Sequence, residues 1–320
     1  MADAVLDIRF AGPHVTVQDG GRSGHMRYGV PHSGPMDRAS HAIANAVLGN
    51  PPGAPAIEIS IGGLNLRCTG SPVTIALAGG GFIARAGETF GTWTVLTLHP
   101  GEELVIRPGH WGSWTYLAFA GRLDVPSWLG SAATHSSSGF GGGKIASGST
   151  ITIRDAIATH APARPIPCPV WARTRHVAHV VLGPQDQYFT PQAQHDLCAA
   201  PFYLSNAYDR MGLRLNGPAL HLTDALSIPS EPILRGSVQV TGEGVATLLM
   251  ADHQTTGGYP KIATVISADL DGLAQLRPRE ALRFVPVTPD RAVEMARLRH
   301  ATVTSFLDRI AGMGLAAGQG

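Results

Sequence analysis

The stretch "ADHQTTGGYPKIATVISADL", residues 251–270, gathers residue types that can move a proton and hold an anion. Asp252 and His253 could act as acid or base, and Lys261 carries a positive charge. Backbone amides around a glycine pair can form an anion-binding nest. We therefore predict that Asp252, His253 and Lys261 are catalytic, although a plain polar turn between two strands has the same spacing. The predicted anion-binding residues between them are Thr255, Thr256, Gly257, Gly258 and Tyr259.

A second cluster of charged residues lies in "QDGGRSGHMRYGVPHSGPMDR", residues 18–38, which has no apolar run. Its candidate residues are Asp19, Arg22, Asp37 and Arg38. Mixed charge on a loop suits a binding site or a protein interface. A solvated loop in which the glycines only turn the chain would fit the same residues.

Two shorter patterns add candidates in the second half of the chain. Gln185 follows a Gly-Pro break where a strand should end, which is a frequent place for a site. Asp209 and Arg210 precede the segment "MGLRL" and could bind an anion. They could equally form an ion pair that fixes the turn.

Several familiar motifs are missing from the sequence. Lys261 is not in a Walker loop, because no Gly-Lys-Ser/Thr follows the glycines. No HExxH, His-x-His or cysteine spacing predicts a metal, so we expect no metal site. The glycine triplets at 79–81 and 141–143 lack the strand–helix context of a dinucleotide fingerprint.

The composition narrows the class of protein. The chain has 320 residues, of which 44% are hydrophobic and 15% are charged, with a net charge of +1. Such a balance argues against nucleic-acid and membrane partners. The first residues include acids and form no long apolar run, so we expect no signal peptide and a cytoplasmic location.

The periodicity predicts a mainly β protein with a few helices, divided into two β-rich domains. Strands are expected at Val15–Gln18, around Ile57–Ile61 and at Lys261–Ile266, and a helix after Asp37. Thr190-Pro191 should start another helix. The final helix, from about 290 to 310, should bury one stripe made of Val293, Leu298, Val303, Phe306 and Ile310.

A proline-rich seam, "HAPARPIPCPVWARTRH", suggests the domain boundary. We place it at about residue 165, which gives domains 1–165 and 166–320.

The block "TVQDGGRSGHMRYGVPHSGPMDRASHAIANAVLGNP" followed by "AIEISIGGLNLR" resembles the N-terminal signature of one protein family. Its members include the C-type component of bacterial 5-oxoprolinase, the KipA-type antagonist of a kinase inhibitor, allophanate hydrolase subunit 2 and part of urea carboxylase. The later blocks "GPQDQYFT", "YDRMGLRLNGPAL", "SEPILRGSVQV" and "DHQTTGGYPKIATVISADLDGLAQLRP" are similar in the same order. The resemblance extends over about residues 10–285.

The resemblance implies a cyclophilin-like β-barrel in the C-terminal half and a B-type partner subunit, similar to KipI or allophanate hydrolase subunit 1. In a 5-oxoprolinase an A-type subunit also takes part, and the assembly opens the lactam of 5-oxoproline to glutamate while hydrolysing ATP. Members are also described as biotin-dependent carboxyltransferases. This chain has no Ala-Met-Lys-Met motif, so any biotin would arrive on another protein.

One segment departs from the family pattern. The family has arginines in a block that reads "GSAATHSSSGFGGG" here, and Ala132 and Ser137 occupy their places. Arginine binds anions with two donors at once. Either the substrate differs, or another subunit supplies the charge.

Three functions therefore compete. The first is a subunit of an ATP-driven lactam or amide hydrolase. The second is a carboxyltransferase subunit that uses a urea-like or guanidine-like acceptor. The third is a KipA-like binding module, which regulates a partner and has no turnover of its own.

Overall fold

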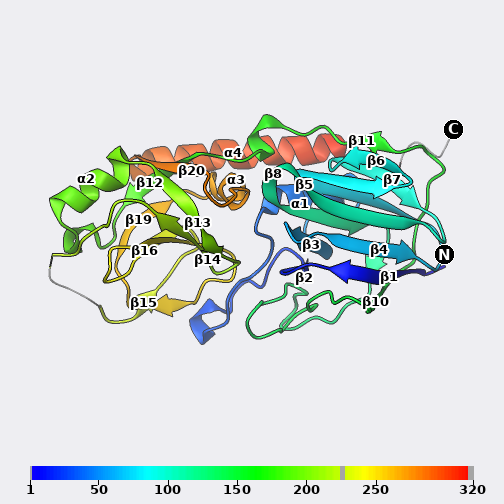
Figure 1. Cartoon of the computed structure of the whole chain (residues 1–320), viewed down its shortest axis with the longest axis horizontal. Coiled ribbons are helices and arrows are strands. Elements are labelled where there is room, and N and C mark those ends of the chain that lie inside the picture. The colour runs from blue at the N-terminus through cyan, green and yellow to red at the C-terminus, as the bar shows by residue number, and fades with distance from the viewer. Residues whose placement is uncertain (1, 224–227, 316–320) are drawn as a thin grey trace. The chain divides into compact units, whose positions relative to one another are not determined.

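The computed structural model describes residues 2–223 and 228–315 (Figure 1). The chain divides into two compact units. The first unit contains the chain up to Arg22, then Ser33–Arg173, and the part from Val303 onward. The second unit contains Ser23–His32 and Thr174–Thr302. We expected a single boundary at about residue 165. In the structure the chain passes from the first unit to the second after Arg173, and it also changes unit at two other places, around Ser23–His32 and at Val303.

The first unit is built on an antiparallel sheet of eleven strands. Eight of them follow the order β11-β7-β5-β8-β4-β1-β10-β9, while β6 pairs with β5 and β3 joins β2 to β8. The bounds are β1 Ala4–Ala11, β2 Thr16–Gln18, β3 Ala56–Ser60, β4 Leu64–Cys68, β5 Val73–Ala86, β6 Glu88–Gly91, β7 Thr94–Leu98, β8 Glu103–Phe119, β9 Arg122–Leu123, β10 Thr150–Arg154 and β11 Arg164–Pro165.

Strand β5 separates two hydrophobic cores. Ile75 and Leu77 belong to one core, and Ala76 and Ala78 belong to the other. Successive side chains of a strand point to opposite faces, so both faces of this strand are buried. The second core includes residues of helix α1 (Arg38–Ala46), which packs against β5 and β8.

The second unit is a closed barrel with the strand order β12-β19-β16-β17-β14-β13-β20, which confirms the barrel predicted for the C-terminal half. The β12–β20 pair is parallel, and the other neighbours pair antiparallel. A short ladder of β15 and β18 accompanies it. The strands are β12 Val177–Leu182, β13 Phe202–Tyr208, β14 Gly212–Asn216, β15 Glu231–Pro232, β16 Ser237–Val240, β17 Ala246–Leu249, β18 Thr256–Gly257, β19 Lys261–Val265 and β20 Ala281–Pro286.

The remaining helices are α2 (Pro191–Ala199), α3 (Leu270–Ala274) and α4 (Pro289–Ile310), with short 3₁₀ turns at Met26–Tyr28, Val170–Ala172 and Asp186–Tyr188. Helix α2 begins as predicted. The Thr190 hydroxyl accepts a hydrogen bond from the Ala193 amide at 3.1 Å, and proline occupies the first helical position.

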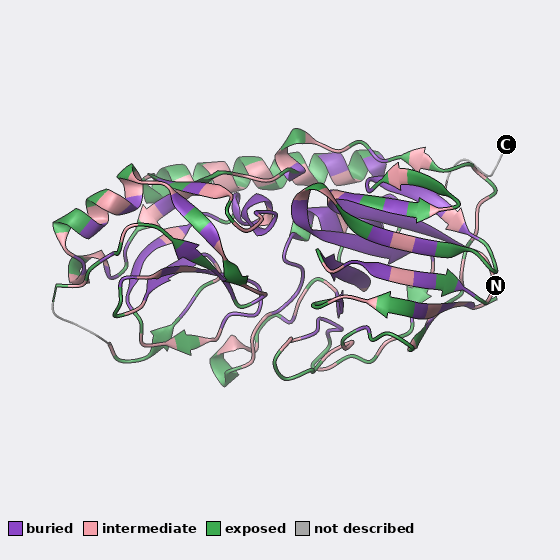
Figure 2. Ribbon diagram, viewed as in Figure 1, coloured by how far each residue is buried: buried purple, intermediate pink, exposed green. Residues whose placement is uncertain are grey.

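The predicted strands around Val17, Ile59 and Lys261 and the helix after Asp37 are confirmed as β2, β3, β19 and α1. The predicted apolar stripe of α4 is only partly right. Phe306 and Ile310 are buried, whereas Val293 and Leu298 are exposed. Buried residues of α4 thus lie toward its C-terminal end (Figure 2). Within residues 2–223 and 228–315, no helix combines the length and the apolar character that crossing a membrane requires.

Candidate functional site

Lys261 begins strand β19, and its side chain is buried beside a carboxylate. Its backbone N–H donates to Gln185 Oε1 at 2.9 Å, and Gln185 Nε2 donates to Glu231 Oε2 at 2.7 Å. The ammonium lies 3.4 Å from the same Glu231 oxygen. The Lys261 side chain is 4% exposed, but that of Glu231 is 49% exposed. Water screens the carboxylate more than the ammonium, so the pair can hold an additional negative group. We call Lys261, Gln185 and Glu231 the lysine cluster.

The glycine pair beside this cluster does not form the predicted nest. Neither Gly257 nor Gly258 has a positive φ, the conformation that a nest requires of one of its residues. Gly257 instead belongs to β18, opposite Glu231. A Cβ atom at Gly257 would lie 2.6 Å from Ile233 Cδ1 and 2.9 Å from Gln239 Nε2. The glycine is therefore needed for close packing of these side chains against the strand.

The polar residues around the glycines differ in exposure. Thr255 is half-buried, whereas Thr256 and Tyr259 are exposed. The Thr255 carbonyl accepts a hydrogen bond from the Ile233 amide at 3.0 Å, so its backbone is committed to the fold. The two threonine hydroxyls remain our prediction for hydrogen bonds to a ligand.

His253 has the properties of a base. Its ring is buried, and burial lowers the pKa of the imidazole, with a smaller opposing effect of the Gln254 carbonyl. His253 Nδ1 lies 2.7 Å from that carbonyl oxygen, which can only accept a hydrogen bond. Nδ1 must therefore carry the proton, and Nε2 is left with the lone pair.

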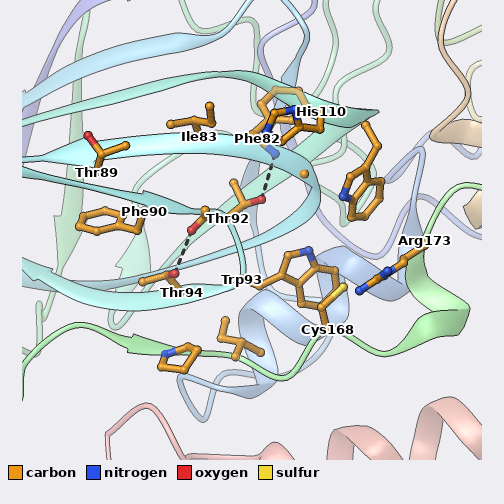
Figure 3. A pocket seen from close by; sticks show the side chains of 15 residues that line it. Phe82, Ile83, Thr89, Phe90, Thr92, Trp93, Thr94, His110, Cys168 and Arg173 are labelled. Atoms are coloured by element: carbon orange, nitrogen blue, oxygen red, sulfur yellow. Dashed lines mark hydrogen bonds between the residues drawn. The ribbon is translucent and has the colours of Figure 1, made fainter.

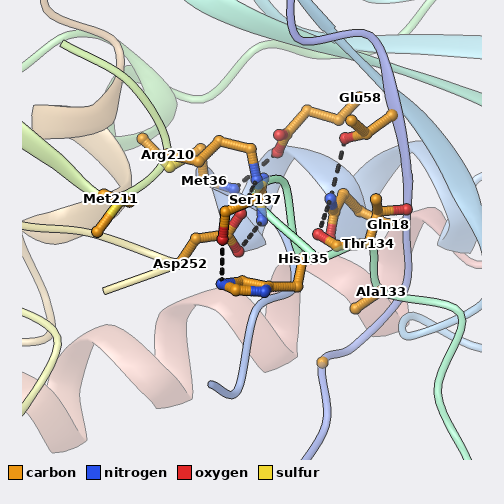
Figure 4. A network of polar contacts seen from close by, with 12 residues as sticks. Gln18, Met36, Glu58, Ala133, Thr134, His135, Ser137, Arg210, Met211 and Asp252 are labelled. Atoms are coloured by element: carbon orange, nitrogen blue, oxygen red, sulfur yellow. Dashed lines mark hydrogen bonds and ion pairs between the residues drawn. The ribbon is translucent and has the colours of Figure 1, made fainter. Parts of the chain in front are cut away.

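Asp252 and Arg210 form a buried ion pair (Figure 4). Arg210 Nε and Nη2 lie 3.0 and 2.9 Å from the two carboxylate oxygens, and each side chain is 1% exposed. The Asp252 amide also donates to the Arg210 carbonyl at 2.8 Å. This two-point contact occupies both carboxylate oxygens, so Asp252 is better suited to fixing the loop than to moving a proton.

Asp209 shapes the turn that precedes β14. Its Oδ1 accepts hydrogen bonds from the amides of Met211 and Gly212, at 2.7 and 3.2 Å. This is an Asx-type turn, in which Asp209 fixes the turn through backbone amides, whereas Arg210 pairs with Asp252.

In the first unit, Asp19 and Arg22 anchor the segment 128–133. Asp19 accepts hydrogen bonds from the Gly21 amide, the Ser131 hydroxyl and the Ala132 amide, at 2.9, 2.7 and 2.6 Å. The buried Arg22 donates to the carbonyls of residues 128 and 133, at 3.0 and 2.8 Å. Its guanidinium also lies 4.8 Å from the centroid of the Trp128 ring.

Asp37 caps helix α1, because its carboxylate accepts hydrogen bonds from the Ser40 amide and hydroxyl, at 2.9 and 2.6 Å. Arg38 is exposed on the first turn of the same helix. Of the two positions where the family has arginine, Ala132 is buried and Ser137 is exposed. Ser137 Oγ lies 3.2 Å from His135 Nε2.

Three residues near Lys261 escaped prediction from sequence: Glu231, Gln239 and Gln254. Gln254 Nε2 donates to Gln239 Oε1 at 3.2 Å, and Gln239 lies opposite Lys261 in the β16–β19 ladder. The block "SEPILRGSVQV" contains both Glu231 and Gln239. An acid and an amide beside a predicted strand were the available signal, but their partners lie far away in sequence.

Comparison with known proteins places this geometry in a family. The family model described as "Carboxyltransferase domain, subdomain A and B" matches residues 28–286. The chain is 35% identical to the C-type component of 5-oxoprolinase from Escherichia coli, over 91% of this chain and 94% of that protein. It is 32% identical to the Haemophilus influenzae protein of the same name, over 96% and 97%.

The fold is also similar to that of a solved structure, the Kluyveromyces lactis urea carboxylase. The TM-score is 0.84 at 24% identity, over 94% of this chain and 29% of that protein. The chain thus belongs to the carboxyltransferase family with subdomains A and B.

Proposed function

We propose that this chain is the C-type component of an ATP-dependent, 5-oxoprolinase-type amidohydrolase that opens the lactam of 5-oxoproline to glutamate. The observation that supports the proposal best is the similarity to the C-type component of the E. coli 5-oxoprolinase along almost the whole of both chains. We further propose that the assembly also contains B-type and A-type subunits, and that it works in the cytoplasm.

The lysine cluster and His253 suit the chemistry of this reaction. Amide resonance makes a lactam carbonyl a poor electrophile, and ATP as co-substrate supplies the phosphoryl group that activates its oxygen. The buried Lys261 ammonium would pair with the negative charge that develops there, where a low dielectric strengthens the interaction. Gln185 holds the Lys261 backbone, and His253 Nε2 would accept a proton from the attacking water.

The test is reconstitution from purified subunits. The chain is mixed with its B-type and A-type partners, 5-oxoproline and ATP, and glutamate and phosphate are measured together. We expect both products from the full mixture and neither when this chain is omitted. No glutamate from a mixture that forms a stable complex would refute the proposal.

Carboxyl transfer is the second candidate, because the family model carries that description and the urea carboxylase has the same fold. The chain would then act on a carboxyl group brought by biotin on another protein. Transfer from carboxybiotin to urea or guanidine, measured with labelled bicarbonate, distinguishes the two. Labelled product in the absence of 5-oxoproline turnover would favour this second function.

A further inference from the structure

The first unit contains a pocket that the proposed function does not use. It is an open pocket of about 680 Å³, and its walls come from β5, β6, residues 92–94, β8 and the segment 165–173 (Figure 3). This volume lies in the usual range for small-molecule sites. The aromatic side chains on its walls are Phe82, Phe90, Trp93 and Trp111.

The glycine triplet Gly79–Gly81 shapes one wall of this pocket, which Gly81 lines. The β5–β8 register shifts at these residues, and Gly79 has a φ of 138°. The Gly79 carbonyl accepts a hydrogen bond from Trp93 Nε1 at 2.7 Å, and the Gly80 carbonyl accepts one from the Thr92 hydroxyl at 2.6 Å. The polar atoms of Trp93 and Thr92 thus have partners within the wall.

Trp111 depends on the same triplet. A Cβ atom at Gly81 would lie 2.2 Å from Trp111 Nε1, so only glycine lets the indole pack against the strand. Trp93 itself has a φ of 72°, an uncommon conformation for a bulky residue. Strain of this kind often marks a ligand site. Two indoles are therefore held in place at the cost of unusual backbone geometry.

Arg173 is the one permanently charged residue among the described residues that line the pocket. Arg173 is exposed and lines the pocket, and none of the described residues that line it is Asp or Glu. Burial raises the pKa of the neighbouring Cys168 thiol, the Arg173 guanidinium partly opposes this effect, and the Asp37 carboxylate adds a smaller increase, so the thiol is uncharged at neutral pH. The guanidinium thus meets no anion among the described residues of the pocket wall.

We propose that this pocket binds a planar, ring-containing carboxylic acid, with the ring against the indoles and the carboxylate on Arg173. Rings stack on tryptophan, and arginine pairs with carboxylates through two donors. The proposal does not depend on oxoprolinase activity, because binding to this chain alone tests it.

The probes are 2-naphthoate and its neutral analogue 2-naphthamide, titrated calorimetrically into the purified chain. We expect saturable binding of the acid, about tenfold tighter than the amide, as a charge-assisted hydrogen bond implies. Arg173→Gln should reduce the affinity for the acid to that for the amide. The control Arg122→Gln removes an exposed arginine of the same unit outside the pocket and should change neither affinity.

Trp111→Leu should weaken both probes by a similar factor, because it removes ring contact and leaves the charge. Thermal unfolding of each variant checks that the fold is intact. Equal affinity for acid and amide, or full affinity for the acid in Arg173→Gln, would overturn the proposal. So would the absence of saturable binding to the folded wild-type chain.

Discussion

Two clusters of charged and polar residues looked alike in the sequence, and the structure uses them differently. In the first unit, the Asp19 carboxylate accepts hydrogen bonds from two backbone amides and from the Ser131 hydroxyl. In the second unit, the buried Lys261 ammonium shares one half-exposed carboxylate with an amide. Residue types do not distinguish the two clusters, but the count of hydrogen-bond partners does. The lysine cluster, in which the buried ammonium has a half-exposed carboxylate as its partner, is therefore the better candidate for chemistry.

The largest effect on stability should come from the buried Arg210–Asp252 pair. Arg210→Met leaves the Asp252 carboxylate buried without its guanidinium, and the free energy of unfolding should fall by about 3–5 kcal/mol. Urea denaturation measures the loss. The control Arg214→Met, at an exposed position on β14, should change it by less than about 0.5 kcal/mol.

Part of that stability should return in the double variant Arg210→Met/Asp252→Leu, because no isolated charge remains. A loss below about 1 kcal/mol in Arg210→Met would mean that the pair is not structural, and the contrast with Lys261 would disappear.

Lys261→Met should separate activity from stability. We expect the reconstituted 5-oxoproline-dependent activity to fall by about 10²–10³-fold, the usual cost of removing one donor to a developing charge. Unfolding free energy should change by less than about 1 kcal/mol, since the Glu231 carboxylate that loses its partner is 49% exposed and stays in contact with water. Wild-type activity in this variant would exclude the lysine cluster as the site, and Lys261→Arg tests whether charge alone suffices.

Acid should destabilise the first unit through His41. Burial lowers the pKa of this imidazole from 6.5 to about 4, so the folded state favours the neutral ring. The stabilisation is complete above about pH 6.5 and is lost as the pH falls toward 4, amounting to about 3 kcal/mol. Burial acts on His253 in the same direction.

Melting temperatures measured between pH 4 and 8 follow this loss. His41→Gln should flatten the acid side of the profile, whereas His99→Gln, at an exposed position, should leave it unchanged. An unaltered profile in His41→Gln would contradict the assignment.

The smallest effect on stability is expected at Asp19, in the charged cluster of the first unit. Asp19→Ala removes an acceptor from three donors and should lower the unfolding free energy by about 1–3 kcal/mol. The control Asp7→Ala removes a surface acid and should cost less than about 0.5 kcal/mol. If Asp19→Ala stayed folded but lost the reconstituted activity, the first cluster would also take part in the reaction.

Local patterns predicted the elements well, because strands and capped helices depend on neighbouring residues. The helix start at Thr190 and the strand at Lys261 are examples. The conformation of Gly257 was not predictable in this way, since its pairing with Glu231 crosses a long stretch of sequence. The carboxylate partner of Lys261 was missed for the same reason. Long-range pairing, rather than residue type, decided the geometry of the candidate site.

Helix α4 determines when the core of the first unit can be completed during synthesis. Its residues Phe306 and Ile310 belong to the same core as Ile43 and Trp93 of the first unit. On a ribosome those two side chains emerge only after the whole barrel sequence, a delay on the order of ten seconds at about 5–20 residues per second. Until then the part of this core that Phe306 and Ile310 cover stays exposed on the growing chain. This is the stage of synthesis at which we expect chaperone binding to matter most.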